Sequence, residues 1–224
     1  MILIIGAQRE EVIEIKDKMI VSNHYNFLNY DVYEGTLNGV SVVLTSGGIG
    51  KVASTIILTS MLNKYQIDRV INVGTCGGLH NVKVFDIIIA NRLVYLDADV
   101  TPFGYRYGQM AKCPPFFESD KNGVEVFLKY DGIMGDMISS DSFFTKNHIL
   151  ASKLDEFKDL DLKSIDMEST SIAQTCFTYG VKFNIIRTIS DCIDDHNQLI
   201  SYEEVLKTSS KKIANILYSA IKEL

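Results

Sequence analysis

The chain has 224 residues, of which 46% are hydrophobic and 22% charged, and its formal net charge is −6. This composition is typical of a globular protein, and the length suits one domain, residues 1–224, better than two. The acidic balance, without any basic block or stripe, argues against nucleic-acid binding, and no apolar run is long enough for a signal peptide or a membrane span.

The first 45 residues predict a strand, a helix and a hairpin. Met1–Ile5 is an apolar run that indicates a buried strand, and Gln8–Met19 follows with apolar residues at helical spacing. Two further strands, Asp31–Glu34 and Val40–Thr45, flank residues 37–39, whose Asn-Gly pair favours the positive φ of a tight turn.

The next part of the chain alternates between helix and strand patterns. A glycine-rich segment at residues 47–50 precedes a long apolar helix, Lys51–Tyr65. Two strands are predicted at Asp68–Gly74, which leads to a Gly77-Gly78 pair, and at Asp86–Val94.

The segment Asp97–Asp120 is looser, because it holds all three prolines and few helix signals. The elements predicted after it are strand Gly132–Ser139, helix Lys146–Phe157, strand Leu162–Met167, helix Glu168–Tyr179, strand Val181–Thr188 and the amphipathic helix Tyr202–Leu224. The alternation predicts a single α/β domain built on a mixed, twisted sheet with helices on its faces.

The four cysteines lie in or beside apolar runs and have no CxxC spacing: Cys76, Cys113, Cys176 and Cys192. This pattern predicts reduced thiols, with neither a metal site nor a disulfide framework, and a cytoplasmic protein.

Polar residues interrupt the apolar pattern where four of the predicted strands end. In open α/β sheets, ligands bind beyond the carboxyl ends of the strands, so these positions are the place to look for chemistry. The four segments are Glu10-Glu11, Gly74–Gly78, Asp166–Thr170 and Arg187–Asp191.

Each segment also has a structural interpretation. Acids in the first turn of a helix favour its positive end, and Asp166, Glu168 or Ser190 can cap helices. The glycine cluster lacks both the GxGxxG and the Walker A pattern. An arginine inside an apolar strand is harder to explain structurally, because a buried guanidinium needs a carboxylate or a ligand as partner. Together the segments predict a site that protonates a leaving group and activates water.

Seven motifs, in this order and at this spacing, resemble the bacterial 5′-methylthioadenosine/S-adenosylhomocysteine nucleosidases, which have the nucleoside phosphorylase fold. They are IIGAQREEV (4–12), SGGIGKVAS (46–54), INVGTCGGL (71–79), DADVTPFGYRYGQ (97–109), SSDSFF (139–144), IDMESTSIA (165–173) and RTISD (187–191). The resemblance implies hydrolysis of methylthioadenosine, S-adenosylhomocysteine and 5′-deoxyadenosine to adenine and the free sugar, with roles in methionine salvage and methyl-cycle detoxification.

The resemblance also implies the catalytic roles. Glu11 matches the base that, with Arg187 and the Thr75 hydroxyl, holds the attacking water. Asp191 matches the acid that protonates adenine at N7, and Ser190 lies beside it. A carboxyl with that task needs a proton at the moment of cleavage, because adenine is a poor leaving group as an anion.

The remaining expected site residues bind the substrate. The resemblance implies that Glu168 binds the ribose hydroxyls and that Met167 packs against the sugar. Phe143 is implied to stack on the adenine ring, and the backbone of Phe144 to bind the adenine edge. The 5′-alkylthio group is implied to contact Ile49, Phe103 and Tyr202. Cys76, Gly77 and Asp166 complete the set. No cofactor or metal is implied.

The resemblance further implies a homodimer whose partner completes the 5′ pocket through the aromatic segment Asp97–Tyr107, with Val100 and Tyr105 as contributors. The chain departs from the family at three positions that bear on substrate preference: Thr75 replaces the usual Ser, Gln8 a frequent Met, and Ala111 a common Pro.

Three alternatives stay open beside this interpretation: a 6-amino-6-deoxyfutalosine nucleosidase, a purine nucleoside phosphorylase of the same fold, and a catalytically silent nucleoside-binding protein. Phosphorolysis needs a cluster of arginines for phosphate, and Arg187 is the only arginine within a strand among the site segments. Hydrolysis is therefore favoured, and the presence of all the expected acids argues against silence.

Overall fold

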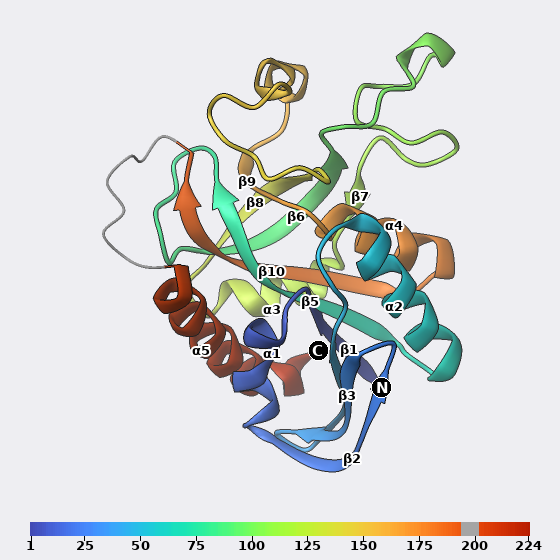
Figure 1. Cartoon of the computed structure of the whole chain (residues 1–224), viewed down its shortest axis with the longest axis vertical. Coiled ribbons are helices and arrows are strands. Elements are labelled where there is room, and N and C mark those ends of the chain that lie inside the picture. Colours follow the sequence, from blue (N-terminus) through green and yellow to red (C-terminus); the bar gives the residue numbers. More distant parts are fainter. Residues whose placement is uncertain (194–201) are drawn as a thin grey trace.

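The computed structural model describes residues 1–193 and 202–224, whose strands form one mixed sheet (Figure 1). The strands are β1 (Ile2–Gly6), β2 (Met19–Phe27), β3 (Tyr30–Leu37), β4 (Val40–Ser46), β5 (Arg69–Gly78), β6 (Ile87–Tyr95), β7 (Phe117–Glu118), β8 (Gly132–Ser139), β9 (Leu162–Asp166) and β10 (Lys182–Cys192). The α-helices are α1 (Arg9–Lys16), α2 (Lys51–Lys64), α3 (Lys121–Leu128), α4 (Ser169–Tyr179) and α5 (Tyr202–Ala220).

The sheet order is β10-β6-β8-β9-β5-β1-β4-β3-β2, and β10 also pairs with β5. Strands β5, β10, β6, β8 and β9 therefore form a closed circuit, while β1, β4, β3 and β2 extend from it as an open sheet. The pairs β1–β4, β1–β5 and β5–β10 are parallel, so their carboxyl ends lie at one edge of the sheet. This edge is where the fold brings distant segments together.

Helices cover both faces of the sheet and bury a separate apolar core on each (Figure 1). Helices α1, α3 and α5 share one core with the sheet, and α2 and α4 share the other. Their apolar positions recur at helical spacing, which gives each helix one face to bury. Within residues 1–193 and 202–224, no helix combines the length and apolar character needed to cross a bilayer.

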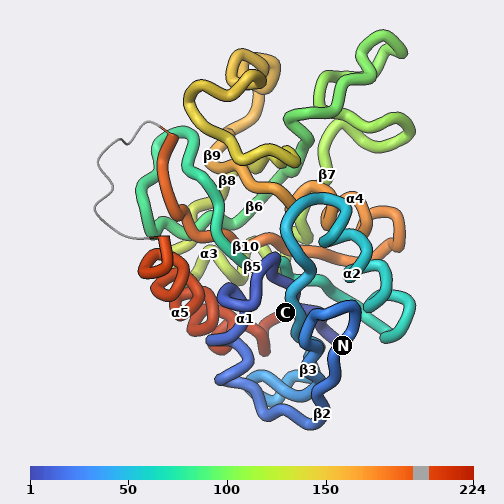
Figure 2. Tube along the Cα trace, viewed as in Figure 1, coloured from blue at the N-terminus to red at the C-terminus, as the bar shows by residue number. Residues whose placement is uncertain are grey.

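Two long connections stand away from this body (Figure 2). Residues 96–116 follow β6 and contain a single 3-10 turn, Thr101–Phe103. Residues 140–161 follow β8 and contain the 3-10 segment Ala151–Phe157. A third core cluster, which includes Tyr107, Phe144 and Phe157, packs the bases of the two connections against the sheet.

The predicted fold class is confirmed as α/β with a mixed sheet flanked by helices. The hairpin turn has the predicted geometry, because Asn38 and Gly39 have φ values of 49° and 83° and Leu37 pairs with Val40. Strand β10 runs four residues further than predicted, so that Ser190 and Asp191 belong to the strand.

One predicted element is wrong, and three were missed. The helix Lys146–Phe157 is instead a turn followed by a 3-10 segment whose bonds join residues three apart, as between Leu150 and Lys153. Only Phe157 of that segment is buried, so no apolar face exists to stabilise a full helix. The missed elements are β2, β7 and α3.

Candidate active site

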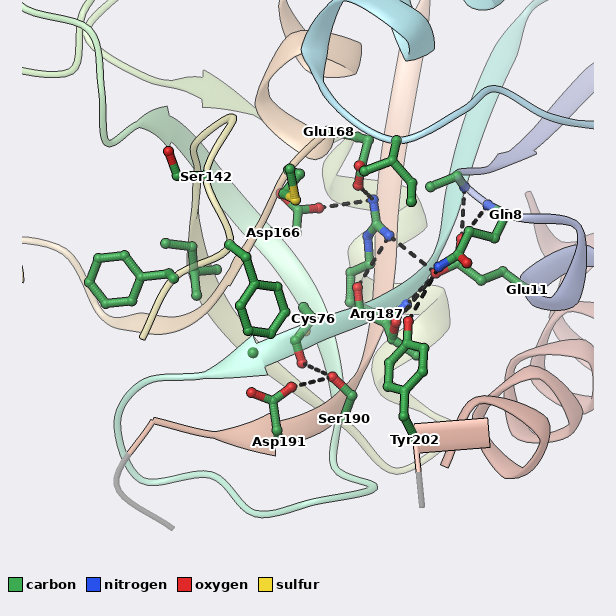
Figure 3. A pocket seen from close by; sticks show the side chains of 18 residues that line it. Gln8, Glu11, Cys76, Ser142, Asp166, Glu168, Arg187, Ser190, Asp191 and Tyr202 are labelled. Atoms are coloured by element: carbon green, nitrogen blue, oxygen red, sulfur yellow. Dashed lines mark hydrogen bonds and ion pairs between the residues drawn. The ribbon is translucent and has the colours of Figure 1, made fainter. Parts of the chain in front are cut away.

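One pocket lies where strands β1, β5, β9 and β10 end (Figure 3). Its volume is about 160 Å³. Its lining comprises Ala7, Gln8, Glu11, Ile49, Thr75, Cys76, Gly77, Ser142, Phe143, Phe144, Ile165, Asp166, Met167, Glu168, Arg187, Ser190, Asp191 and Tyr202. Polar groups from six separate parts of the chain thus meet in one cavity.

Glu11 is buried in the first turn of α1, and its carboxylate is held by backbone N–H groups. Oε2 accepts hydrogen bonds from the N–H groups of Ala7 (2.7 Å) and Gln8 (3.0 Å), while Oε1 accepts one from Thr75 (2.9 Å). The Thr75 hydroxyl lies 3.4 Å from Oε1. These bonds, together with the positive end of α1, fix the carboxylate beside the end of β5.

Arg187 is only 1% exposed and lies among three carboxylates. Its Nη2 is 2.9 Å from Asp166 and 3.4 Å from Glu168, and its Nη1 is 3.9 Å from Glu11. Burial alone would lower the pKa of Arg187, but these three acids keep it above its ordinary value. The guanidinium is therefore charged and satisfies the expectation that a buried arginine needs carboxylate partners.

Glu168 immediately precedes α4, and the glycine-rich segment before α2 helps to place it. Its Oε1 accepts a hydrogen bond from the N–H of Gly50 at 2.9 Å. Burial raises the pKa of Glu168 to about 7, with the charges of Asp166 and Glu11 adding to the effect and Arg187 opposing it. Burial likewise raises the pKa of Cys76, so this pocket thiol is neutral and does not act as a nucleophile.

A β-bulge brings Ser190 and Asp191 into the pocket together. The register of β10 on β5 shifts between Ile189 and Asp191, which leaves Ser190 as the extra residue. Neighbouring residues of a regular strand point to opposite faces, whereas both of these line the cavity. The Ser190 hydroxyl lies 2.6 Å from Asp191 Oδ1 and 3.2 Å from the Cys76 carbonyl.

Gly74 lets the side chains of Glu11 and Arg187 approach the backbone of β5 closely. Its φ is 152°, and a Cβ at this position would overlap both Arg187 Nη1 and Glu11 Oε1. The close approach of the carboxylate and the guanidinium to this strand thus depends on the absence of a side chain.

The pocket contains fourteen of the seventeen residues expected from the sequence. The three that do not line it are Val100, Phe103 and Tyr105. They lie on the connection after β6, where Phe103 is 80% exposed and the Tyr105 hydroxyl accepts a hydrogen bond from the N–H of Lys112. Within one chain this connection does not contribute to the cavity.

Sequence reasoning missed two groups of site residues. Ala7, Gln8, Ser142 and Ile165 line the pocket beside residues that were expected. Asn72 and Ser169 bind Arg187 without lining the pocket. Asn72 Oδ1 accepts a hydrogen bond from Nη2 at 2.7 Å, and the Ser169 hydroxyl accepts one from Nε at 3.2 Å. Asn72 could have been found, because it is a polar residue inside the apolar run of β5.

The site holds no arrangement suited to a metal among the described residues, since no group of three or more His, Cys, Asp or Glu side chains there could bind one. What the arrangement offers is acid and base chemistry. Carboxylates lie at both ends of one cavity, with a single buried cation near the middle (Figure 3).

Comparisons with known proteins identify the family of the chain. Residues 1–222 match the model of the phosphorylase superfamily. A 5′-methylthioadenosine/S-adenosylhomocysteine nucleosidase of Staphylococcus haemolyticus is 37% identical over 100% of both chains. The S. pneumoniae nucleosidase bound to a transition-state inhibitor has a TM-score of 0.90 at 31% identity, covering 99% of this chain and 98% of its own. The Neisseria meningitidis enzyme in complex with methylthio-immucillin-A also gives 0.90, at 31% identity, over 100% and 99%. The chain therefore belongs to the phosphorylase superfamily and, within it, to the 5′-methylthioadenosine/S-adenosylhomocysteine nucleosidases.

Proposed function

We propose that the chain hydrolyses the N-ribosidic bond of 5′-methylthioadenosine, S-adenosylhomocysteine and 5′-deoxyadenosine, releasing adenine and the free sugar. Family membership supports the reaction class, since the relatives are nucleosidases by name. The observation that carries the proposal is the placement of Arg187 among Glu11, Asp166 and Glu168, with Asp191 separately placed in the same pocket.

At the base end, Asp191 donates a proton to N7 of adenine. Protonation removes the need for an anionic leaving group, which is the main barrier to cleaving this bond. Ser190 bridges Asp191 and the Cys76 carbonyl, so the carboxyl is held in one orientation. Phe143, at the same cavity, offers an aromatic ring on which the adenine stacks.

At the sugar, bond cleavage leaves positive charge on C1′ and the ring oxygen. Glu168 binds the ribose hydroxyls, and its charge, together with those of Glu11 and Asp166, stabilises the developing cation. A water molecule between Glu11, the Thr75 hydroxyl and Arg187 attacks C1′ from the face opposite adenine, and Glu11 accepts its proton. The two separated carboxyls parallel those of inverting glycoside hydrolases.

The charge around the cavity favours water over phosphate as the nucleophile. Among the described residues that line it, Arg187 is the only permanent cation, and three carboxylates already surround it. A phosphate ion at this position would be repelled by Glu11 and would find no second arginine to bind it. Hydrolysis is therefore the reaction that the site supports.

The same proposal includes a homodimer in which the partner completes the 5′ end of the pocket. Apolar side chains are exposed on α2, where Val52 is 71% exposed and Ile56 49%, and on α4, where Phe177 is 53% exposed. Helices α2 and α4 pack against each other, and the exposed Phe103 lies on the connection after β6. Such a set of exposed apolar residues suits burial against a second copy.

We also assign the enzyme to the cytoplasm. Cys76, Cys113 and Cys176 are reduced thiols, and Cys76 and Cys176 are buried. Reduced thiols are typical of that compartment.

The decisive experiment incubates the purified protein with each of the three nucleosides, with and without inorganic phosphate, and identifies the sugar product by mass spectrometry. We expect free adenine and the free reducing sugar, at rates independent of phosphate. A ribose 1-phosphate product would assign the chain to the phosphorylases instead. No cleavage of any nucleoside, with binding retained, would indicate a nucleoside-binding protein.

A further inference from the structure

The ring proposed to stack on adenine belongs to a segment with little packing of its own. Phe143 lies on the connection after β8, residues 140–161, which stands away from the sheet (Figure 2). Within one chain its side chain is 72% exposed, and its neighbour Ser142 is exposed as well. Phe144, by contrast, is buried in the third core cluster. Phe143 is therefore fixed on one side by Phe144 and needs a second anchor on the other.

Asp141, two residues before Phe143, is bound to the start of α2. Its Oδ1 accepts a hydrogen bond from the N–H of Lys51 at 2.8 Å, and its Oδ2 lies 3.6 Å from Lys51 Nζ. The side chain of Asp141 is 47% exposed, so the ion pair alone contributes little. The hydrogen bond is the stronger contact, because a carboxylate at the positive end of a helix gains from its charge and from the aligned peptide dipoles.

Regular structure fixes the groups that bind Asp141. Lys51 begins α2, and its Nζ lies 2.8 Å from both carboxylate oxygens of Asp97. Asp97 follows Leu96, which is fully buried and donates its N–H to the carbonyl of Ser139 at the end of β8. Asp97 Oδ2 in turn accepts a hydrogen bond from the Asp141 N–H at 3.2 Å. The segment before Phe143 is thereby tied to a helix and to the end of the sheet.

The start of α2 also places the carboxylate proposed to bind ribose. The Gly50 N–H donates to Glu168 Oε1 at 2.9 Å, and the next N–H along the chain, that of Lys51, donates to Asp141. Two consecutive N–H groups therefore hold the acid at the sugar and the anchor of the segment at the adenine. One rigid element thus sets the distance between the two halves of the nucleoside site.

We infer that Asp141 is a positioning residue, which holds Phe143 at the adenine site through its hydrogen bond to the start of α2. The inference rests on the proposed function, in which Phe143 stacks on adenine. Asp141 does not itself line the pocket, so its effect on adenine must pass through Phe143. Without the anchor, adenine would have to order the ring on binding, at a cost in affinity.

Calorimetric titration of the full chain with adenine tests the inference. Phe143→Ala should weaken adenine binding by about 20-fold, the loss expected for one stacking ring. Asp141→Ala should weaken it by about five-fold, but should cause no further loss when residue 143 is already alanine. Asp141→Asn keeps an oxygen acceptor for the Lys51 N–H, so it should bind adenine within about two-fold of the parent.

Asp159→Ala provides the matched control. Asp159 is 55% exposed, lies at the other end of the same connection, and accepts a hydrogen bond from Arg106 Nη1 at 2.6 Å. This variant also separates a carboxylate of the connection from its cationic partner, and it should bind adenine like the parent.

Three results would overturn the inference: parent-like binding in Asp141→Ala, a further loss in the double variant, or an equal loss in Asp141→Asn or Asp159→Ala. Failure of the proposed function would look different, because the parent protein would then bind no adenine, and both proposals would fall together.

Discussion

Two arginines are buried on the neighbouring parallel strands β5 and β10. Arg69 begins β5 and is 4% exposed, while Arg187 lies midway along β10, closer to the carboxyl ends of the strands, and is 1% exposed. Arg69 pairs with one carboxylate, Asp120, at 2.9 Å and donates to the Asn184 side chain. Arg187 faces three carboxylates within 4 Å.

The difference shows how charge balance separates a structural ion pair from a reactive site. At the amino end the carboxylate of Asp120 is balanced by Arg69 and also by Lys182, at 3.6 Å, so no surplus of negative charge is left there. At the carboxyl end the acids outnumber the cation, which is costly in a buried site. That surplus becomes favourable only when a positive charge develops nearby, as it does on a ribose whose base is leaving.

The largest expected effect on turnover is that of replacing Asp191, which lies outside the group of acids around Arg187. Asp191→Asn keeps the shape of the side chain but removes the proton donor, so turnover should fall by about 10⁴-fold, at the upper end for general acid catalysis. Affinity for a non-hydrolysable nucleoside analogue should largely survive. Single-turnover kinetics and calorimetric titration measure the two quantities. Near-normal turnover would reduce Asp191 to a structural role.

The same substitution at the two arginines should have different effects on turnover. Arg69→Met leaves the half-buried Asp120 with only Lys182, at 3.6 Å, as a cationic partner, so the free energy of unfolding should fall by about 1–3 kcal/mol while kcat of the folded protein stays the same. Arg187→Met should reduce kcat by more than about 100-fold. Urea unfolding measures the stability of both variants, and steady-state kinetics measures their turnover. A loss of turnover in Arg69→Met would break the distinction between the two ends.

The surplus of negative charge should also be visible as a pH dependence of stability. Because the folded-state pKa of Glu168 is raised from 4.5 to about 7, folding favours its protonated form. The contribution of this group is fully present below pH 4.5 and is lost as the pH rises toward 7, by an amount on the order of 3 kcal/mol.

Urea unfolding of the ligand-free protein between pH 4.5 and 8 measures this contribution. Glu168→Gln should remove this part of the slope, so the variant should gain stability relative to the parent as the pH rises. A constant difference across the range would contradict the prediction. Glu10→Gln, an exposed neighbour of the site, serves as the control.

The smallest expected effect separates the roles of the two glutamates. Glu11→Gln should lower turnover by about 100-fold with little change in affinity for a nucleoside analogue, since the proposed role of Glu11 is to activate the water. Glu168→Gln should weaken binding of the analogue and slow turnover together, because its proposed role is to bind the ribose hydroxyls. Equal losses of affinity in both variants would show that the two carboxylates share one task.

Much of the site could be predicted because its residues break local patterns. Arg187 is a charge inside an apolar strand, Asp166 ends another strand and Glu168 comes just after it, so the sequence alone marks them as costly to bury. The β-strands and helices with strong apolar periodicity were also found. The hairpin at Asn38-Gly39 follows from turn chemistry.

What could not be predicted depends on tertiary contacts. Strand β2 is almost wholly exposed, so it shows no alternation of apolar residues and is held by its pairing with β3. Helix α3 has eight residues, of which Gly123 packs against Asn184, a contact no local pattern encodes. Likewise, the bulge that brings Ser190 and Asp191 to one face arises from the register with β5.

Gly74 gives the site an unusual constraint on its evolution. Even the smallest side chain at position 74 would overlap Glu11 Oε1 and Arg187 Nη1, so both groups would have to move. Arg187 also contacts Asp166 and Glu168, and its displacement would therefore reach the carboxylates on the far side of the guanidinium. One added methyl group on the backbone of β5 would thus disturb every acid in the cluster at once, although none of them had been changed.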